Sequence, residues 1–204
     1  MTLKLHGHPI SGHVHRVRLF LSLLGLPFED VLVDLRKGEH KSPAFLAKNP
    51  FGQVPVLEDG DVTIADSNAI LVYLALKHDA DGTWLPRDPA GAAAVQRWLS
   101  AAAGPLANGP SPLRAEVLLG VSIDRERAQR LTDQLLGVLE QTLGARPYLV
   151  GARATLADVA LYSYTSLAPE GGVSLASYPS VRAWLARIEA LPGFVHPQRV
   201  QAGG

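Results

Sequence analysis

The feature of this sequence that most constrains its fold is a change of hydrophobic pattern near residue 78. Before that point, short runs with strand character alternate with helical segments, whereas from Ala90 onward every periodic segment has helical spacing. We therefore predict a compact α/β domain over 1–78 and an all-helical domain over 90–204. The stretch 79–89 is rich in Asp, Gly and Pro, and we interpret it as a linker held in place by Trp84 and Leu85. A length of 204 residues accommodates two such domains, since domains of about 100 residues are common.

The N-terminal part predicts the order β-α-β, a short helix, and then β-β-α. Apolar positions favour a strand around Leu3 and Leu5, a helix over 12–24 and a second strand over 28–33. A strand–helix–strand unit normally places its two strands parallel. Two further apolar runs, 54–57 and 62–64, flank an acidic glycine turn and predict an antiparallel hairpin, followed by a helix over 66–77.

The C-terminal part predicts four helices, over 90–103, 124–143, 155–168 and 179–190. The segment from Gly104 to Pro112 interrupts this pattern and is interpreted as a loop or a helix kink. Thr155 and Asp158 have the spacing of a capping box, so Asp158 is expected to stabilise the start of a helix and not to take part in catalysis.

The charge balance limits the expected partners. Lys and Arg together number 19, as do Asp and Glu, so no net charge favours nucleic acid or an anionic membrane as a partner. No run reaches the roughly 18 apolar residues that would span a bilayer. The N-terminus lacks the basic and continuous apolar regions of a signal peptide, so the expected compartment is the cytosol.

Cysteine is absent, so any thiol chemistry must use a thiol that a ligand brings. Four histidines lie close together in the sequence, namely His6, His8, His13 and His15. They show no recognised metal-ligand spacing and have no carboxylate nearby in the sequence, so we expect no metal site.

Pro55 interrupts an apolar run that otherwise reads as a strand, which leaves two interpretations. It opens an edge strand, or it follows a cis peptide bond. In the second case the backbone N–H and C=O of Val54 turn outward and can bind a peptide-like ligand.

Two further segments have both a structural and a functional interpretation. Asp66, Ser67 and Asn68 open a helix, where they act as a cap or as a carboxylate site in which Asp66 holds an ammonium group. Ser11 lies between the first strand and the first helix, where its hydroxyl can donate a hydrogen bond to an anion. The pattern G-x-S-x-G of a nucleophile elbow is missing, so no Ser–His–Asp triad is indicated.

Four segments together resemble the glutathione transferase superfamily, in particular its phi-like and related bacterial members. They are SGHVHRVRLFLSLLGLPFE from Ser11, GEHKSPAFLAKNPFGQVPVLEDGD from Gly38, TLADVALYSY from Thr155 and YPSVRAWLARIEALPGF from Tyr178. They occur in the same order and cover nearly the whole chain. The resemblance implies a thioredoxin-like N-terminal domain and an all-helical C-terminal domain.

The resemblance also implies glutathione as co-substrate and a role for each matching residue. Ser11 would stabilise the thiolate, and lowering the thiol pKa from about 8.5 by two units corresponds to about 2.7 kcal/mol. The resemblance places the glycine carboxylate at His40 and Lys41, the cysteinyl part at Gln53 and Val54 with Pro55 cis, and the γ-glutamyl end at Asp66 and Ser67. It places the electrophile pocket between the domains, with His13, Trp98, Asn108 and Arg114 as candidates.

The expected activity is conjugation of glutathione to a small apolar electrophile by a homodimer. The alternatives are a non-catalytic binding or regulatory protein of the same fold, or a glutathione-dependent isomerase, dehalogenase or peroxidase. Two features differ from the usual family pattern. Asp66 stands where Glu is more common, and the lack of cysteine argues against the branch that uses a cysteine for deglutathionylation.

Overall fold

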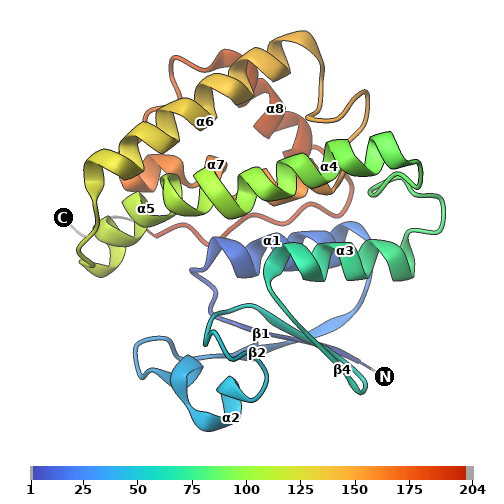
Figure 1. Ribbon diagram of the computed structural model, residues 1–204, viewed down its shortest axis with the longest axis vertical. Coiled ribbons are helices and arrows are strands. Elements are labelled where there is room, and N and C mark those ends of the chain that lie inside the picture. The colour runs from blue at the N-terminus through green and yellow to red at the C-terminus, as the bar shows by residue number, and fades with distance from the viewer. Residues whose placement is uncertain (1, 201–204) are drawn as a thin grey trace.

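A four-stranded sheet and a group of helices stacked above it make up the molecule (Figure 1). The computed structural model describes residues 2–200. The N-terminal elements are β1 (Leu3–Gly7), α1 (Gly12–Leu23), β2 (Phe28–Leu32), η1 (Glu39–Lys41), α2 (Pro43–Leu46), β3 (Val56–Asp59), β4 (Val62–Ala65) and α3 (Ser67–His78). The remaining elements are α4 (Pro89–Ala101), η2 (Ala102–Leu106), α5 (Pro110–Leu119), α6 (Arg125–Ala145), α7 (Leu156–Ser166), η3 (Ala168–Gly171) and α8 (Pro179–Glu189).

The sheet has the strand order β2-β1-β3-β4 and is mixed. β1 and β2 pair in parallel, with Leu3 opposite Phe28, because α1 carries the chain back over the sheet between them. β3 pairs antiparallel with both β1 and β4, and the β3–β4 pair is a hairpin. The predicted β-α-β unit and the predicted hairpin are therefore both confirmed.

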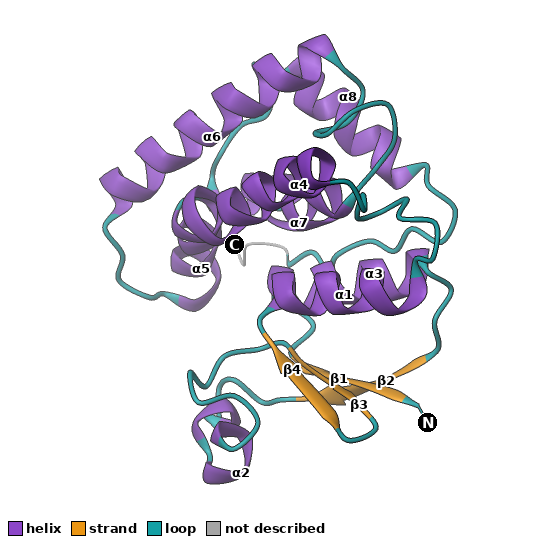
Figure 2. Cartoon of the chain, turned by 45° about the vertical axis from the view of Figure 1, so that its right-hand side comes forward, coloured by secondary structure: helices purple, strands orange, loops and turns teal. Residues whose placement is uncertain are grey.

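The two faces of the sheet have separate apolar contacts. α1 and α3 cover one face, while α2 lies on the opposite side (Figure 2). Side chains alternate along a strand, so neighbours on β3 point to opposite faces. Leu57 belongs to the main core with α1 and α3, whereas Val56 packs with Val33 and Phe45 in a smaller cluster on the α2 side.

Residues 79–89 are held in place by hydrogen bonds and by an aromatic contact. The Asp79 carboxylate accepts hydrogen bonds from the backbone N–H groups of Thr83, Trp84 and Leu85. The Trp84 ring packs edge-to-face on Phe20 of α1, with ring centroids 5.4 Å apart. The predicted anchoring of this segment by Trp84 is therefore confirmed.

α7 is the central helix of the C-terminal part, since each of its residues is buried. Asp158 caps its first turn, accepting hydrogen bonds from the backbone N–H and hydroxyl of Thr155. Its other carboxylate oxygen accepts from the Leu149 N–H and the Trp184 indole, both at 2.9 Å. Burial raises the pKa of Asp158, and the hydrogen bonds it accepts oppose that shift. The predicted capping box and structural role of Asp158 are confirmed.

One helix was not predicted from the sequence. The segment from Gly104 to Pro112, interpreted as a loop or a kink, contains a π-helical turn, η2, followed by the start of α5. Proline is tolerated in the first helical turn because the N–H groups there have no partner within the helix. Pro110 and Pro112 occupy that turn of α5, so the prolines that suggested an interruption mark the beginning of a helix.

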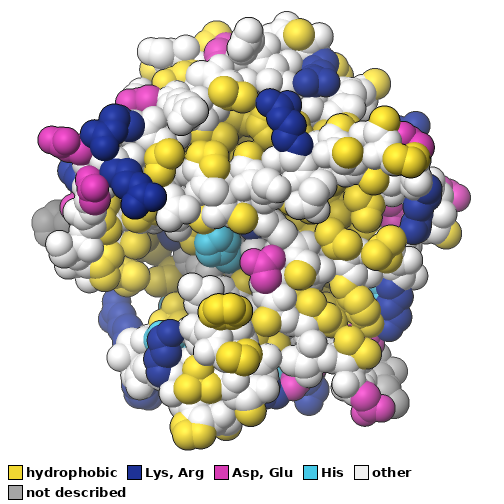
Figure 3. All heavy atoms as spheres, viewed as in Figure 1, with side chains coloured by type: hydrophobic (Ala, Val, Ile, Leu, Met, Phe, Trp, Pro, Cys, Tyr) yellow, Lys and Arg dark blue, Asp and Glu magenta, His cyan; other side chains and the backbone are white. Residues whose placement is uncertain are grey.

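The surface carries interspersed charges on the face seen in Figure 3, where basic side chains do not gather into one area. Within residues 2–200, none of the helices combines the length and the apolar character required to cross a membrane.

Candidate functional site

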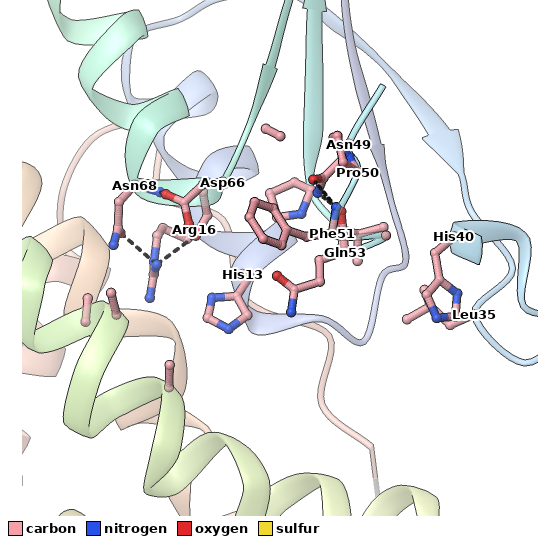
Figure 4. Close-up of a pocket in the computed structure, with 18 of the residues that line it drawn as sticks. His13, Arg16, Leu35, His40, Asn49, Pro50, Phe51, Gln53, Asp66 and Asn68 are labelled. Carbon is pink, nitrogen blue, oxygen red and sulfur yellow. Dashed lines mark hydrogen bonds between the residues drawn. The ribbon is translucent and has the colours of Figure 1, made fainter. Parts of the chain in front are cut away.

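A cleft of about 890 Å³ opens between the sheet domain and the helices above it (Figure 4). One wall comes from α1, from the segments 35–55 and 65–68, and the other from the η2 region, residues 102–108. Nine residues predicted from the sequence line this cleft: His13, His40, Lys41, Gln53, Val54, Pro55, Asp66, Ser67 and Asn108. Segments more than 90 residues apart in the chain therefore meet around one space of a size typical for small-molecule sites.

Ser11 is the residue immediately before α1 and caps this helix. Its Oγ accepts a hydrogen bond from the Val14 backbone N–H at 3.3 Å. A hydroxyl can donate one hydrogen bond while it accepts others. No recorded hydrogen bond within residues 2–200 uses the Ser11 O–H, so this donor is available to a ligand at the positive end of the helix. Ser11 is not among the residues that line the cleft, although His13, two residues later in the chain, is.

The peptide bond between Val54 and Pro55 is cis, which decides between the two interpretations of this proline. β3 begins directly afterwards at Val56, and both Val54 and Pro55 line the cleft. The preceding turn is held by Asn49, whose Nδ2 donates to the Gln53 carbonyl at 2.8 Å.

Asp66 caps α3 and lines the cleft as well, so the two interpretations of this segment do not exclude each other. Its Oδ1 accepts from the backbone N–H groups of Asn68 and Ala69, at 2.9 and 3.0 Å. Its φ is 74°, an unusual value that aspartate tolerates better than most residues. Ser67 follows at the first position of the helix, and its backbone N–H, unlike those of Asn68 and Ala69, is not taken up by the Asp66 cap and can bind an anion.

Arg16 is a buried cation behind Ser67 that was not predicted from the sequence. Its Nη1 donates to Ser67 Oγ and to Asn68 Oδ1, both at 2.8 Å. The bond to Asn68 can be followed in Figure 4. Its Nε and Nη2 are buried without a hydrogen-bond partner among the residues that the structure describes. Burial lowers the pKa of Arg16 to about 10, so it stays charged at neutral pH, and it makes this end of the cleft electropositive.

Arg16 falls within an apolar helical pattern in the sequence, which gave no sign that its side chain would be buried. Arg16 and Asn68 both line the cleft and connect α1 to α3.

The far end of the cleft holds two basic residues of η1. Lys41 Nζ donates to the backbone carbonyls of Phe51 and Gly52, at 3.2 and 3.0 Å, which leaves one of its three donors for a ligand. The Nδ1 of His40 is buried and has no partner within the described part of the chain.

His13 lies between these two ends, close to Gln53 and Arg16 in Figure 4. Its imidazole contacts the Tyr164 ring edge-to-face, with centroids 4.9 Å apart. Burial, and secondarily the charge of Arg16, lower the pKa of His13 to about 3, so the ring is neutral at physiological pH. It therefore presents an uncharged polar group to the cleft.

Two of the predicted electrophile-pocket residues, Trp98 and Arg114, are not among the residues that line the cleft. Trp98 is buried against the helical core, where its indole N–H donates to the Leu149 carbonyl at 3.1 Å. Arg114 is buried as well, because its guanidinium pairs with Glu170 and with a backbone carbonyl. Asn108 does line the cleft, and its side-chain amide donates to the Gly104 carbonyl at 2.8 Å.

Metal-ligating side chains do not cluster in this region. Within residues 2–200, no three His, Cys, Asp or Glu side chains lie close enough to hold a metal ion.

Two family descriptions match the chain. The glutathione S-transferase N-terminal domain matches residues 1–76, and the glutathione S-transferase C-terminal domain matches residues 121–192. Among curated proteins, glutathione S-transferase 3 of Zea mays is 41% identical over 202 residues, covering 94% of this chain and 91% of that protein. Glutathione S-transferase theta-2 of Homo sapiens is 36% identical, covering 95% of this chain and 83% of that protein.

Solved structures agree with these matches. A glutathione S-transferase from Pseudomonas fluorescens superposes with a TM-score of 0.90 at 35% identity, covering 98% of this chain and all of that chain. A glutathione transferase homologue from Drosophila mojavensis, solved with bound glutathione, has a TM-score of 0.84 at 34% identity, with coverage of 94% and 89%. The similarity thus spans both the sheet domain and the helices.

Proposed function

Because this chain belongs to the glutathione S-transferase family and is a glutathione transferase, we propose that its cleft binds glutathione and that Ser11 stabilises the thiolate. The observation that carries the proposal is the convergence of three segments on the cleft. These are the cis-proline turn at 53–55, the start of α3 and the two basic residues of η1.

The γ-glutamyl end of the tripeptide carries a carboxylate and an ammonium group. We assign the carboxylate to the hydroxyl and the backbone N–H of Ser67 at the start of α3, and the ammonium to Asp66. Arg16 orients the Ser67 hydroxyl through a 2.8 Å hydrogen bond and adds positive charge near the carboxylate.

The rest of the tripeptide extends along the sheet domain. We assign the cysteinyl part to Gln53 and the backbone of Val54, since both residues line the cleft directly before β3. His40 and Lys41 bind the glycine carboxylate. The Nδ1 of His40 has no hydrogen-bond partner in the described part of the chain, and Lys41 Nζ has one donor left after its bonds to two backbone carbonyls.

The thiol then lies near the start of α1, where Ser11 acts. A thiol with a pKa near 8.5 is mostly protonated at neutral pH, and stabilising the anion increases the amount of nucleophile. The Ser11 O–H donates a charge-assisted hydrogen bond to the sulfur, and the N-terminus of α1 adds the favourable field of the helix.

The electrophile binds against the helical wall, which consists of small apolar side chains, Ala102, Ala103 and Ala107, and the amide of Asn108. His13 lies at the boundary and offers a neutral imidazole to the reacting pair. This composition favours small, mostly apolar electrophiles, consistent with conjugation in detoxification.

We propose domain limits at 1–78 and 90–204, with a linker over 79–89. We further propose that the protein is a homodimer in the cytoplasm. Phe51 is 82% exposed, and an apolar groove of about 610 Å³ lies between α3 and α4, lined by Val72, Tyr73, Leu76 and Leu99. Large exposed apolar groups of this kind are typical of association surfaces.

Calorimetric titration with reduced glutathione and with S-hexylglutathione tests the proposal. We expect saturable binding of both, and tighter binding of S-hexylglutathione because its alkyl chain enters the helical side of the cleft. Absence of binding for both ligands contradicts the assignment of the cleft.

A further inference from the structure

A buried arginine outside the cleft contacts the segment that carries Ser11. Arg114 belongs to α5, and its Nη1 donates to the carbonyl of Ile10, the residue before Ser11, at 2.7 Å. Its Nε pairs with Glu170 of η3, also at 2.7 Å. Both side chains of this ion pair are almost fully buried, so solvent screens the interaction little.

We call residues 8–11 the β1–α1 segment. The Arg114–Ile10 hydrogen bond differs from the other hydrogen bonds of this segment because it joins residues far apart in the chain. The other recorded hydrogen bonds of this segment are local, such as Ser11 N–H to the His8 carbonyl at 3.0 Å and Val14 N–H to Ser11 Oγ. Within residues 2–200, the one recorded hydrogen bond that joins it to the C-terminal helices is that from Arg114. The local contacts fix the shape of the segment, and the start of α1 that follows it packs on α7 through Tyr164. Arg114 adds the hydrogen bond that ties the segment itself, at the Ile10 carbonyl, to α5.

Arg114 is also close in the chain to the opposite wall of the cleft. Ala107 and Asn108 line that wall, and α5 begins two residues later at Pro110. α5 packs closely on η3, where the Gly171 position leaves no room for a side chain beside the Arg114 backbone. The wall that faces the electrophile and the group that holds Ile10 therefore lie on one stretch of consecutive helical elements, η2 and α5, the second of which is packed against η3.

Stability alone is a weak explanation for this arrangement. Buried ion pairs often contribute no more than well-packed apolar side chains of similar volume. Here Nη2 of Arg114 is also buried without a partner in the described part of the chain, which is an additional cost.

We propose that Arg114 is a positioning residue for catalysis, which sets Ser11 at the correct distance from the helical wall by holding the Ile10 carbonyl. This inference rests on the proposed role of Ser11. Arg114 does not touch the substrate. Its contact with the β1–α1 segment affects the rate of the thiolate reaction and not the affinity for glutathione.

The experiment compares Arg114→Met with the wild type in kcat, in KM for glutathione and in the pH midpoint for ionisation of bound glutathione. Misplacement of a reacting group by about 1 Å can cost about 100-fold in rate. We expect kcat to fall at least about tenfold, the ionisation midpoint to rise, and KM for glutathione to change less than about threefold.

The matched control is Arg187→Met, which removes an arginine that donates from Nε to the Pro147 carbonyl at 3.0 Å, remote from the cleft. We expect this variant to have wild-type kinetics. Thermal unfolding of both variants shows whether Arg114→Met is folded. If it is not, Arg114→Lys keeps the positive charge and one of the two bonds, and we expect a smaller fall in kcat with the same pattern.

A double-mutant cycle separates this inference from the proposed function. If Arg114 acts through Ser11, adding Arg114→Met to Ser11→Ala lowers kcat little further. Two results overturn the inference: folded Arg114 variants keep the wild-type kcat and ionisation midpoint, or they change only KM for glutathione. In either case Ser11→Ala still tests the proposed function independently. Full activity of Ser11→Ala overturns the proposed function itself.

Discussion

The two walls of the cleft differ in chemistry and in how their residues are fixed. The wall from the sheet domain, here called the polar wall, carries nearly all the polar side chains of the cleft, and several of them are held by hydrogen bonds, such as the Arg16–Ser67 and Asn49–Gln53 contacts. The helical wall presents Ala102, Ala103 and Ala107, which offer no directional interaction. A tripeptide with two carboxylates and an ammonium group matches the first wall. The second wall selects its ligand mainly by size and apolar surface, so we expect strict recognition of glutathione and loose recognition of the electrophile.

The largest expected effect concerns the thiolate at the edge of the polar wall. Ser11→Ala removes the hydroxyl that donates to the sulfur, and we expect kcat at pH 7 to fall about 100-fold, the equivalent of two pKa units. KM for glutathione should change little, because the rest of the polar wall is intact. Steady-state kinetics measure both. A loss confined to KM contradicts a role for Ser11 in the chemical step.

A smaller effect is expected within the polar wall itself. Ser67→Ala removes one of the two acceptors for Arg16 Nη1 and a donor to the γ-glutamyl carboxylate. We expect glutathione to bind about tenfold more weakly, since hydrogen bonds to charged groups contribute roughly 1.5 kcal/mol or more. Calorimetry measures the affinity, and Ser174→Ala on an exposed turn serves as the control. Equal affinities for the variant and the wild type mean that the γ-glutamyl end binds elsewhere.

A substitution in the helical wall should change the binding of the electrophile and leave the binding of glutathione unchanged. Ala107→Leu adds three carbon atoms to the electrophile side, and we expect KM for the electrophile to change about threefold to tenfold, depending on its size, because an apolar pocket discriminates only modestly between ligands of similar size. Glutathione affinity should be unaffected. Ala93→Leu makes the same change at an exposed position of α4 and should have no effect. A change in glutathione affinity for Ala107→Leu contradicts the division between the walls.

The smallest effect is expected for His13, at the boundary between the walls, on the pH dependence of kcat/KM. The pKa of His13 is lowered to about 3, so the ring takes up a proton only as the pH falls toward that value. Its protonation therefore contributes nothing to the pH profile of kcat/KM between pH 5.5 and 9. His13→Asn should leave the midpoint of that profile within about 0.3 units. A midpoint that disappears in this variant shows that His13 titrates during the reaction.

The sequence predicted the polar wall better than the helical wall, for a physical reason. Gln53, Pro55, Asp66 and Ser67 lie in turns and at a helix start, where local patterns determine the backbone. Arg16 was missed because its burial results from contacts with Ser67 and Asn68, about 50 residues away. On the helical side, neither Trp98 nor Arg114 could be placed from periodicity.

Those two positions show what local patterns lack. Trp98 points into the core because a carbonyl at Leu149 accepts its indole N–H, and Arg114 is buried because Glu170 neutralises its charge. α5 was missed as well, since its prolines indicate a break unless the position of the helix start is known. Which side chains of a helix become buried depends on partners far away in the chain, and a single sequence does not reveal these partners.

The most direct test of the central claim is an ultraviolet titration of the thiolate of bound glutathione in the wild type and in Ser11→Ala. We predict that the wild type shows a thiol pKa well below the free value of about 8.5, and that the variant returns it most of the way to that value. Equal midpoints in the two proteins contradict the assignment of Ser11 as the group that stabilises the thiolate.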